Sequence, residues 1–131
     1  MENGKKYKIL IVDDDKFLLN MYSMKFGKNG FDVSTAPGGT EALAQLRSGF
    51  NPDALLLDII MPTIDGKELL RTVKKENLAP HAAVVMLTNQ GGESDVSEAK
   101  TLGADGYIVK ATTIPSEVVE EVLKIVKAKD R

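Results

Sequence analysis

The sequence of 131 residues contains no cysteine, a single histidine and only a small excess of acidic over basic residues. The absence of cysteine excludes disulfides, thiol catalysis and cysteine-ligated metals, and it is compatible with a reducing cytoplasm. A formal net charge of −2 gives no general attraction to phosphate backbones. We therefore expect a soluble, cytoplasmic protein that does not contact nucleic acid directly in this region.

Long hydrophobic segments and repeats are also missing. The amino-terminal sequence MENGKKYKILIV has basic residues, but its apolar run before Asp13 is too short for a signal peptide or a membrane span. No internal repeat, low-complexity tract or interdomain linker interrupts the chain. Since a chain of this length can bury a true core, we predict one domain over residues 1–131 without membrane association.

Apolar runs of strand length alternate with segments of helical spacing along the whole chain. The predicted strands are Lys8–Val12, Phe31–Ala36, Ala54–Leu57, Ala82–Leu87 and Gly106–Lys110. The predicted helices are Lys16–Asn29, Thr40–Ser48, Glu93–Leu102 and two segments that open after Asp65 and at Pro115. This alternation is typical of an α/β fold with a parallel sheet.

Two of the predicted helices carry specific expectations about packing. In the first helix, Phe17, Met21 and Met24 recur at helical spacing, and we predict that they face the core. The fourth helix, Glu93–Leu102, offers the thinnest apolar face and follows Gly91-Gly92. We therefore predict that the fourth helix is among the least firmly docked elements.

The hydrophobic pattern of the strands predicts their order in the sheet. Three runs are uniformly apolar, as expected for strands covered on both faces, whereas Phe31–Ala36 alternates and Gly106–Lys110 is short. The second and fifth strands are therefore expected at the edges, and right-handed crossovers then give the order 2-1-3-4-5. We predict a doubly wound, flavodoxin-like (βα)5 fold whose crevice lies between the first and third strands.

Asp58 interrupts the apolar segment ALLLDIIMPTIDG at the point where the third strand ends. Alone it could be a turn or capping residue, because Asp is common at both. The carboxyl ends of parallel strands share one rim of the sheet, so Asp13 and Asp14 should lie beside Asp58. Thr88 ends the fourth strand and Lys110 ends the fifth, which brings a hydroxyl and an ammonium group to the same rim.

Three neighbouring carboxylates raise each other's proton affinity unless a cation compensates their charge. Mg²⁺ fits this rim, because it prefers a few oxygen ligands, keeps several waters and can accept a phosphoryl oxygen. An Asp beside such a metal is a competent nucleophile toward phosphorus. Lys110 would then meet the charge of the phosphoryl group, and Thr88 would donate a hydrogen bond to it.

The segments IVDDD, ALLLDIIMPTIDG, VVMLTN and GADGYIVK, in this order and at these intervals, resemble the receiver domain of bacterial two-component response regulators. The resemblance extends from about Lys6 to Ala128. Within the family, the chain is similar to the stand-alone chemotaxis-type regulators. Chemotaxis members of the family have the same strand order, so the predicted order agrees with the resemblance without being independent of it.

The resemblance implies the chemistry of a signalling phosphoprotein. It implies that Asp58 accepts a phosphoryl group from the phosphohistidine of a histidine kinase or phosphotransfer protein, which forms an aspartyl phosphate. It also implies that Mg²⁺ is held by Asp13, Asp14, Asp58 and the backbone carbonyl of Ile60. Such a domain assists its own phosphorylation and dephosphorylation but is not an enzyme acting on other substrates.

The same resemblance implies a route for signal transduction. Thr88 and Lys110 would bind the phosphoryl group, and Tyr107 would be the aromatic residue that changes rotamer with Thr88. The surface of the fourth helix, fifth strand and fifth helix would then contact a downstream protein target or an output domain. Phosphorylation at the rim would thus alter a surface on one side of the domain.

Two positions depart from the usual family pattern. Family members usually have Pro where this chain has Ala111, and a small residue where it has Asn89. Because a cis peptide before a residue other than Pro costs about 2.5–4 kcal/mol, we predict a trans Lys110-Ala111 bond. Asn89 could narrow the approach of a phosphoryl donor to Asp58.

Three other classes of function remain open at this stage. A phosphatase of the haloacid-dehalogenase type would require a second Asp, as general acid, two residues after Asp58, but this chain has Ile60 at that position. A nucleotide- or flavin-binding module would require a Gly-rich phosphate-binding loop after the first strand, but this chain has Asp13-Asp14-Asp15 there. A receiver-like interaction scaffold that is never phosphorylated is the main alternative. His81, the only histidine, has no second ligand candidate and is expected to be an exposed loop residue.

Overall fold

The computed structural model describes residues 6–89 and 93–130, so the Gly91-Gly92 segment lies outside the described residues. Strands and helices alternate as predicted, with small differences at their ends. The strands are β1 (Lys8–Val12), β2 (Asp32–Ala36), β3 (Ala54–Asp58), β4 (Ala83–Thr88) and β5 (Gly106–Val109). The helices are α1 (Lys16–Lys28), α2 (Gly39–Arg47), α3 (Gly66–Lys75), α4 (Glu93–Thr101) and α5 (Pro115–Lys129), and a short 3-10 helix covers Lys110–Thr112.

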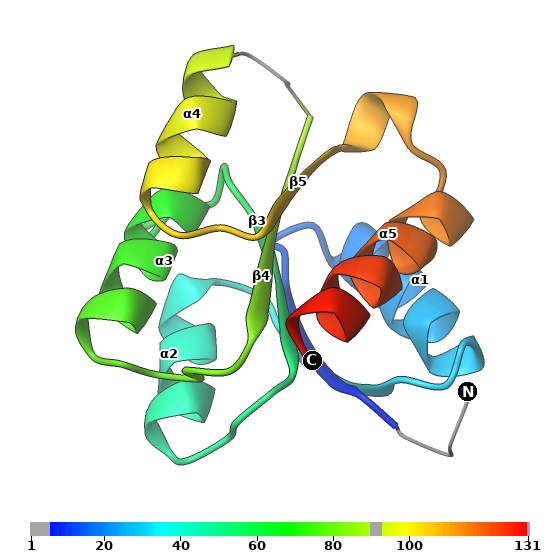
Figure 1. Ribbon diagram of the computed structural model, residues 1–131, viewed down its shortest axis with the longest axis horizontal. Coiled ribbons are helices and arrows are strands. Elements are labelled where there is room, and N and C mark those ends of the chain that lie inside the picture. Colours follow the sequence, from blue (N-terminus) through cyan, green and yellow to red (C-terminus); the bar gives the residue numbers. More distant parts are fainter. Residues whose placement is uncertain (1–5, 90–92, 131) are drawn as a thin grey trace.

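The five strands form one parallel sheet in the order β2-β1-β3-β4-β5, which confirms the predicted fold and strand order. Helices α1 and α5 cover one face of the sheet, and α2, α3 and α4 cover the other (Figure 1). The order reverses between β1 and β3, so their carboxyl ends flank the crevice where ligands bind in open α/β sheets.

Side chains from the central strands divide between two hydrophobic cores. Ile9, Ile11 and Leu56 point toward α1 and α5, whereas Leu10 and Leu57 point toward α2, α3 and α4. Since both faces are covered, β3 and β4 are buried along their whole length. This explains why these strands read as continuous apolar runs rather than alternating ones.

The predicted buried face of α1 is wrong for Phe17 and Met24, whereas Met21 packs against the core. Phe17 and Met24 are 76% and 64% exposed, and Met21 is half-buried. The core instead receives Leu19, Tyr22 and Phe26; Phe26 packs edge to face against Phe31, with ring centroids 5.0 Å apart. Because α1 has apolar residues on two faces, helical spacing alone did not decide which face packs against the sheet.

Helix α4 is thinly anchored by apolar side chains, as predicted. Among its described side chains, Ala99 is buried and Val96 is only half-buried. By contrast, α5 buries Val118, Val119, Val122 and Val126.

No helix within residues 6–89 and 93–130 combines the length and apolarity that crossing a bilayer requires.

Candidate functional site

Three carboxylates meet where β1 and β3 end. Asp13 follows β1 directly and is 1% exposed, Asp58 is the last residue of β3 and is 7% exposed, and Asp14 is exposed. One carboxylate oxygen from each of the three lies within 4.8 Å of those of the other two. The structure therefore brings together the three acidic residues that the sequence predicted to converge.

Lys110 directly follows the edge strand β5, and its side chain reaches this carboxylate cluster. Its Nζ donates a hydrogen bond to Asp13 Oδ2 at 2.9 Å and lies 3.4 Å from Asp58 Oδ1. The Lys110 side chain is only 8% exposed. The bond to Ala111 is trans, as predicted, and the 3-10 helix begins at Lys110. The missing proline therefore does not prevent the lysine from reaching the carboxylates.

Burial and repulsion shift the proton affinity of Asp58. The pKa of its carboxyl is raised to about 7, because burial and then the charge of Asp13 raise it more than Lys110 lowers it. For Lys110, burial lowers the pKa, but the hydrogen bond with Asp13 and the charges of both carboxylates outweigh this, so its pKa is above the usual value. Lys110 is therefore positively charged at neutral pH, and the cluster remains short of positive charge.

Thr88 ends β4 beside the cluster and is 2% exposed. The cavity over the carboxylates is lined by Asp13, Asp14, Asp15, Leu18, Asp58, Ile60, Thr88, Asn89 and Lys110. Asn89 is exposed at its edge, at the position where the sequence suggested an obstacle to a phosphoryl donor. The hydroxyl, the ammonium and the three carboxylates thus share one opening, as predicted.

Sequence reasoning did not identify every residue around this cavity. Leu18 of α1 lines it, and no sequence motif had pointed to this residue. Asp15, the third residue of the acidic run, serves α1 instead: its Oδ1 accepts hydrogen bonds from the N–H groups of Phe17 and Leu18 at 3.0 and 3.2 Å. The sequence signal for this role was an Asp immediately before an apolar helix, the usual position of an N-cap.

Tyr107 lies in β5 and is half-buried against the core formed with α2, α3 and α4. Burial raises the pKa of its hydroxyl and Asp95 adds to this, while Lys67 and a hydrogen bond with Thr88 oppose it. Tyr107 and Thr88 are therefore in contact, as their predicted joint movement requires. The structure describes one arrangement of this pair.

The donor set fits a hard divalent cation. When all three carboxylates are ionised, the single ammonium leaves two negative charges at the cluster. The carboxylates offer oxygen atoms, which Mg²⁺ prefers as ligands. The cavity is open to solvent on the side of the exposed Asp14. Ile60 lines the same cavity. Asp13, Asp14 and Asp58 are thus the residues that would hold such an ion.

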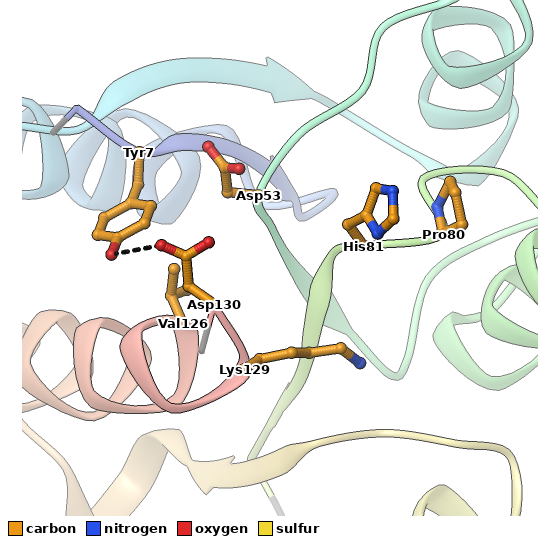
Figure 2. A pocket seen from close by; sticks show the side chains of 7 residues that line it. All are labelled: Tyr7, Asp53, Pro80, His81, Val126, Lys129 and Asp130. Atoms are coloured by element: carbon orange, nitrogen blue, oxygen red, sulfur yellow. Dashed lines mark hydrogen bonds between the residues drawn. The ribbon is translucent and has the colours of Figure 1, made fainter.

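His81 lies far from these groups, at the opposite end of the sheet. Figure 2 shows it beside a shallow cavity where the amino ends of β1, β3 and β4 meet the end of α5. Across this cavity the Tyr7 hydroxyl donates a hydrogen bond to Asp130 Oδ2 at 3.2 Å. His81 is exposed in the turn before β4, which agrees with the prediction of an exposed loop residue.

In metal-free protein, we expect Asp58→Asn to raise the free energy of unfolding by about 1–3 kcal/mol above pH 7 but to have little effect near pH 4. Folding raises the pKa of Asp58 from its ordinary value of 3.8 to about 7. Stability from the protonated carboxyl is therefore present below the lower value and lost as the pH rises through the higher one. Urea unfolding with a chelator measures the difference.

The exposed Asp32 at the start of β2 provides the matched control for this pH dependence. Asp32→Asn removes the same charge at the other end of the sheet and should leave the unfolding free energy nearly unchanged at every pH. A difference between wild type and Asp58→Asn that stays constant from acid to neutral pH would contradict the expectation.

Comparison with known proteins gives one consistent family. The profile of the response regulator receiver domain matches residues 9–123. The transcriptional regulatory protein TrcR of Mycobacterium tuberculosis is 35% identical over 108 residues, which are 82% of this chain and 41% of that protein. The alkaline phosphatase synthesis regulator PhoP of Bacillus subtilis is 33% identical over 92% of this chain and 48% of its own length. The chain spans about half the length of the curated relatives it matches.

Solved structures agree with the sequence matches. A CheY-like receiver domain protein from Methanospirillum hungatei is 28% identical with a TM-score of 0.86, over 96% of this chain and 98% of that one. The beryllofluoride-activated receiver domain of DrrB is 28% identical with a TM-score of 0.80, over 94% of this chain and 99% of that one.

Proposed function

Because the chain belongs to the family of response regulator receiver domains, we propose that Asp58 is its phosphoacceptor. The observation that carries the proposal is the position of the Asp58 carboxylate: at the end of β3, among Asp13 and Asp14, with Lys110 Nζ 3.4 Å away. We also propose that residues 1–131 form a single receiver domain, with the family's chemistry contained in it.

Asp13, Asp14 and Asp58 would hold Mg²⁺, with the backbone carbonyl of Ile60 as a further ligand. The donor set and its two uncompensated negative charges support this assignment. When bound, Mg²⁺ neutralises charge on the transferring phosphoryl oxygens and keeps the Asp58 carboxylate ionised.

The chain's own residues provide position and charge for phosphoryl transfer. An ionised oxygen of Asp58 attacks phosphorus and forms the new O–P bond, while the bond to the imidazole nitrogen of the donor breaks and the imidazole leaves. Lys110, fixed by its hydrogen bond to Asp13, meets the charge of the phosphoryl oxygens. The Thr88 hydroxyl donates a hydrogen bond to one of the phosphoryl oxygens.

We propose a histidine kinase or phosphotransfer protein as the phosphoryl donor and a downstream protein or output domain as the recipient of the signal. Two relatives are named as transcriptional regulatory proteins, which supports the control of transcription as the output. In this chain, the net charge of −2 argues against direct nucleic-acid contact. The domain is not a recognised enzyme, and its only reactions would be its own phosphorylation and dephosphorylation.

Acetyl phosphate tests the phosphoacceptor role without a cognate kinase. Incubation with Mg²⁺ should raise the intact mass by one phosphoryl group, and a chelator should prevent the increase. An unchanged mass with Mg²⁺ present would favour a receiver-like scaffold that is never phosphorylated.

Beryllofluoride with Mg²⁺ is expected to shift amide NMR signals of residues 93–110 and of α5, beyond those around Asp58. The physical reason is that a group on Asp58 draws the Thr88 hydroxyl inward and leaves space for Tyr107. Thr88→Ala should reduce the remote shifts by at least about half, because it removes this link, while Mg²⁺ binding stays largely intact.

Thr101→Ala is the matched control, since Thr101 is exposed at the end of α4 and its hydroxyl donates a hydrogen bond to the local Ser97 carbonyl at 3.0 Å. It should leave the remote shifts in place. Shifts that persist fully in Thr88→Ala, or that are confined to the outer face of α2, would rule out this coupling route and leave Asp58 as the acceptor.

A further inference from the structure

Lys67, the second residue of α3, holds α4 at two points. Its Nζ donates to Asp95 Oδ1 at 2.7 Å and to Glu98 Oε1 at 2.6 Å. The Lys67 side chain is 19% exposed, so most of the side chain is covered. Asp95 and Glu98 are three residues apart and therefore lie on one face of α4. Hydrogen bonds with Asp95 and then Glu98 raise the pKa of Lys67, which keeps it charged.

These ion pairs matter because α4 has few apolar anchors. Ala99 is buried and Val96 is half-buried, whereas α3 buries Leu69, Leu70 and Val73. An element held by so little apolar area depends on its polar contacts for its position. The two ion pairs thus contribute to the position of α4 beside α3.

Lys67 is also tied closely to the backbone of the phosphoacceptor. The preceding residue, Gly66, packs so closely on the carbonyl oxygen of Asp58 that a Cβ at this position would overlap it. The Gly66 N–H donates to the Ile59 carbonyl at 2.7 Å, and Asp65 Oδ1 accepts the Glu68 N–H at 2.8 Å. The position of Lys67 is therefore set by the segment that directly follows Asp58.

The ion pairs border the two residues proposed to transmit the signal. A cavity lined by Ile59, Ile60, Met61, Asp65, Lys67, Thr88 and Asp95 lies between the β3–α3 connection and α4. Thr88 lines both this cavity and the one over the carboxylates. The charges of Asp95 and Lys67 both act on the hydroxyl of Tyr107. A rearrangement of Thr88 and Tyr107 would thus take place next to the ion pairs.

We propose that Lys67 is a positioning residue whose ion pairs with Asp95 and Glu98 favour the arrangement of α4 that the structure describes and thereby limit the response of the α4-β5-α5 surface to Asp58. The proposal rests on the proposed function and concerns its regulation. An interaction that favours one of two arrangements lowers the population of the other, and a ligand selective for that other arrangement then binds with lower apparent affinity. Loss of the ion pairs should therefore make the domain easier to activate.

Lys67→Met tests this, because methionine keeps most of the aliphatic stem and removes the charge. Amide hydrogen exchange in residues 93–101 should become about fivefold faster, and beryllofluoride with Mg²⁺ should bind about threefold to fivefold more tightly by NMR titration. Lys67→Arg should restore both values, since it retains the positive charge. In wild type, raising the salt concentration should move exchange in α4 toward the Lys67→Met value, because salt screens ion pairs at partly exposed positions.

Lys100→Met is the matched control. Lys100 is an exposed residue of α4 that forms no ion pair with the residues the structure describes, so its replacement should change neither measurement. An equal thermal unfolding midpoint for Lys67→Met and Lys100→Met excludes general unfolding as the cause of faster exchange.

The outcomes separate the ion-pair proposal from the proposed function. If wild type does not bind beryllofluoride, the phosphoacceptor assignment fails and the regulatory role of Lys67 fails with it. If wild type binds but Lys67→Met binds no more tightly, only the role of Lys67 is overturned, even where exchange in α4 is faster. Equal changes in Lys67→Met and Lys100→Met would also overturn it, because the effect would then be one of net charge.

Discussion

Asp58→Asn is expected to abolish Mg²⁺-dependent uptake of a phosphoryl group from acetyl phosphate, while the folded structure should be retained. Asn has nearly the shape of Asp but offers no anionic oxygen to attack phosphorus, and it removes one of the three carboxylates that would hold the metal. Intact-mass measurement after incubation should show one added phosphoryl group in wild type and none in the variant. This is the largest change expected for any single substitution at the site.

Asp32→Asn is again the control, because it removes the same charge as Asp58→Asn. Asp32 is exposed at the amino end of β2, away from the carboxylate cluster. It should take up the phosphoryl group as wild type does. An equal mass increase in Asp58→Asn would show that another residue accepts the group. Unfolding measured in parallel would show whether the variant is folded, so a negative result can be assigned to chemistry.

Gly66→Ala is expected to destabilise the domain by about 2–3 kcal/mol and to disturb the phosphoacceptor. A Cβ at residue 66 would overlap the Asp58 carbonyl oxygen and come within 2.9 Å of Ile59 Cα and 3.0 Å of Asp58 C. All three are backbone atoms at the end of a buried central strand, so they cannot move aside as a flexible side chain would. The midpoint of urea unfolding and the uptake of phosphoryl from acetyl phosphate should both fall.

Gly27→Ala provides the comparison, since Gly27 lies in α1, is exposed, and has no atom within 4 Å of an added Cβ. There the same substitution should stabilise the domain by about 0.5–1 kcal/mol, because Ala favours a helix more than Gly does. Equal effects at the two positions would mean that crowding at the Asp58 carbonyl is not what requires a glycine at residue 66.

The sheet and the acidic site were accessible from the sequence because each left a strong local signal. Strands β3 and β4 are covered on both faces, so their sequences are continuous apolar runs, and the residue that ends each run is polar. Parallel pairing then places those ends together, which is why Asp58, Thr88 and Lys110 could be assigned to one rim without coordinates.

Other features depend on tertiary packing that no local pattern encodes. Two apolar stripes run along α1, and the buried one was decided by the fit of Phe26 against Phe31, five residues further along the chain. The pairing of Lys67 with Asp95 and Glu98 joins two helices across 28 and 31 residues. Its only local trace was a cation in the first turn of a helix, where the helix dipole disfavours positive charge.

The hydrogen bond between Lys110 and Asp13 joins residues 97 positions apart, and this separation has a consequence for folding. A chain that has paired only β1, β2 and β3 already holds Asp13 near Asp58, but the lysine that relieves their repulsion arrives with the last strand. Such distant contacts form slowly, since a long loop must close before they stabilise anything. The ammonium group of the site is thus in place only in the fully assembled sheet, so a partly folded chain has the carboxylates without the lysine that offsets part of their repulsion.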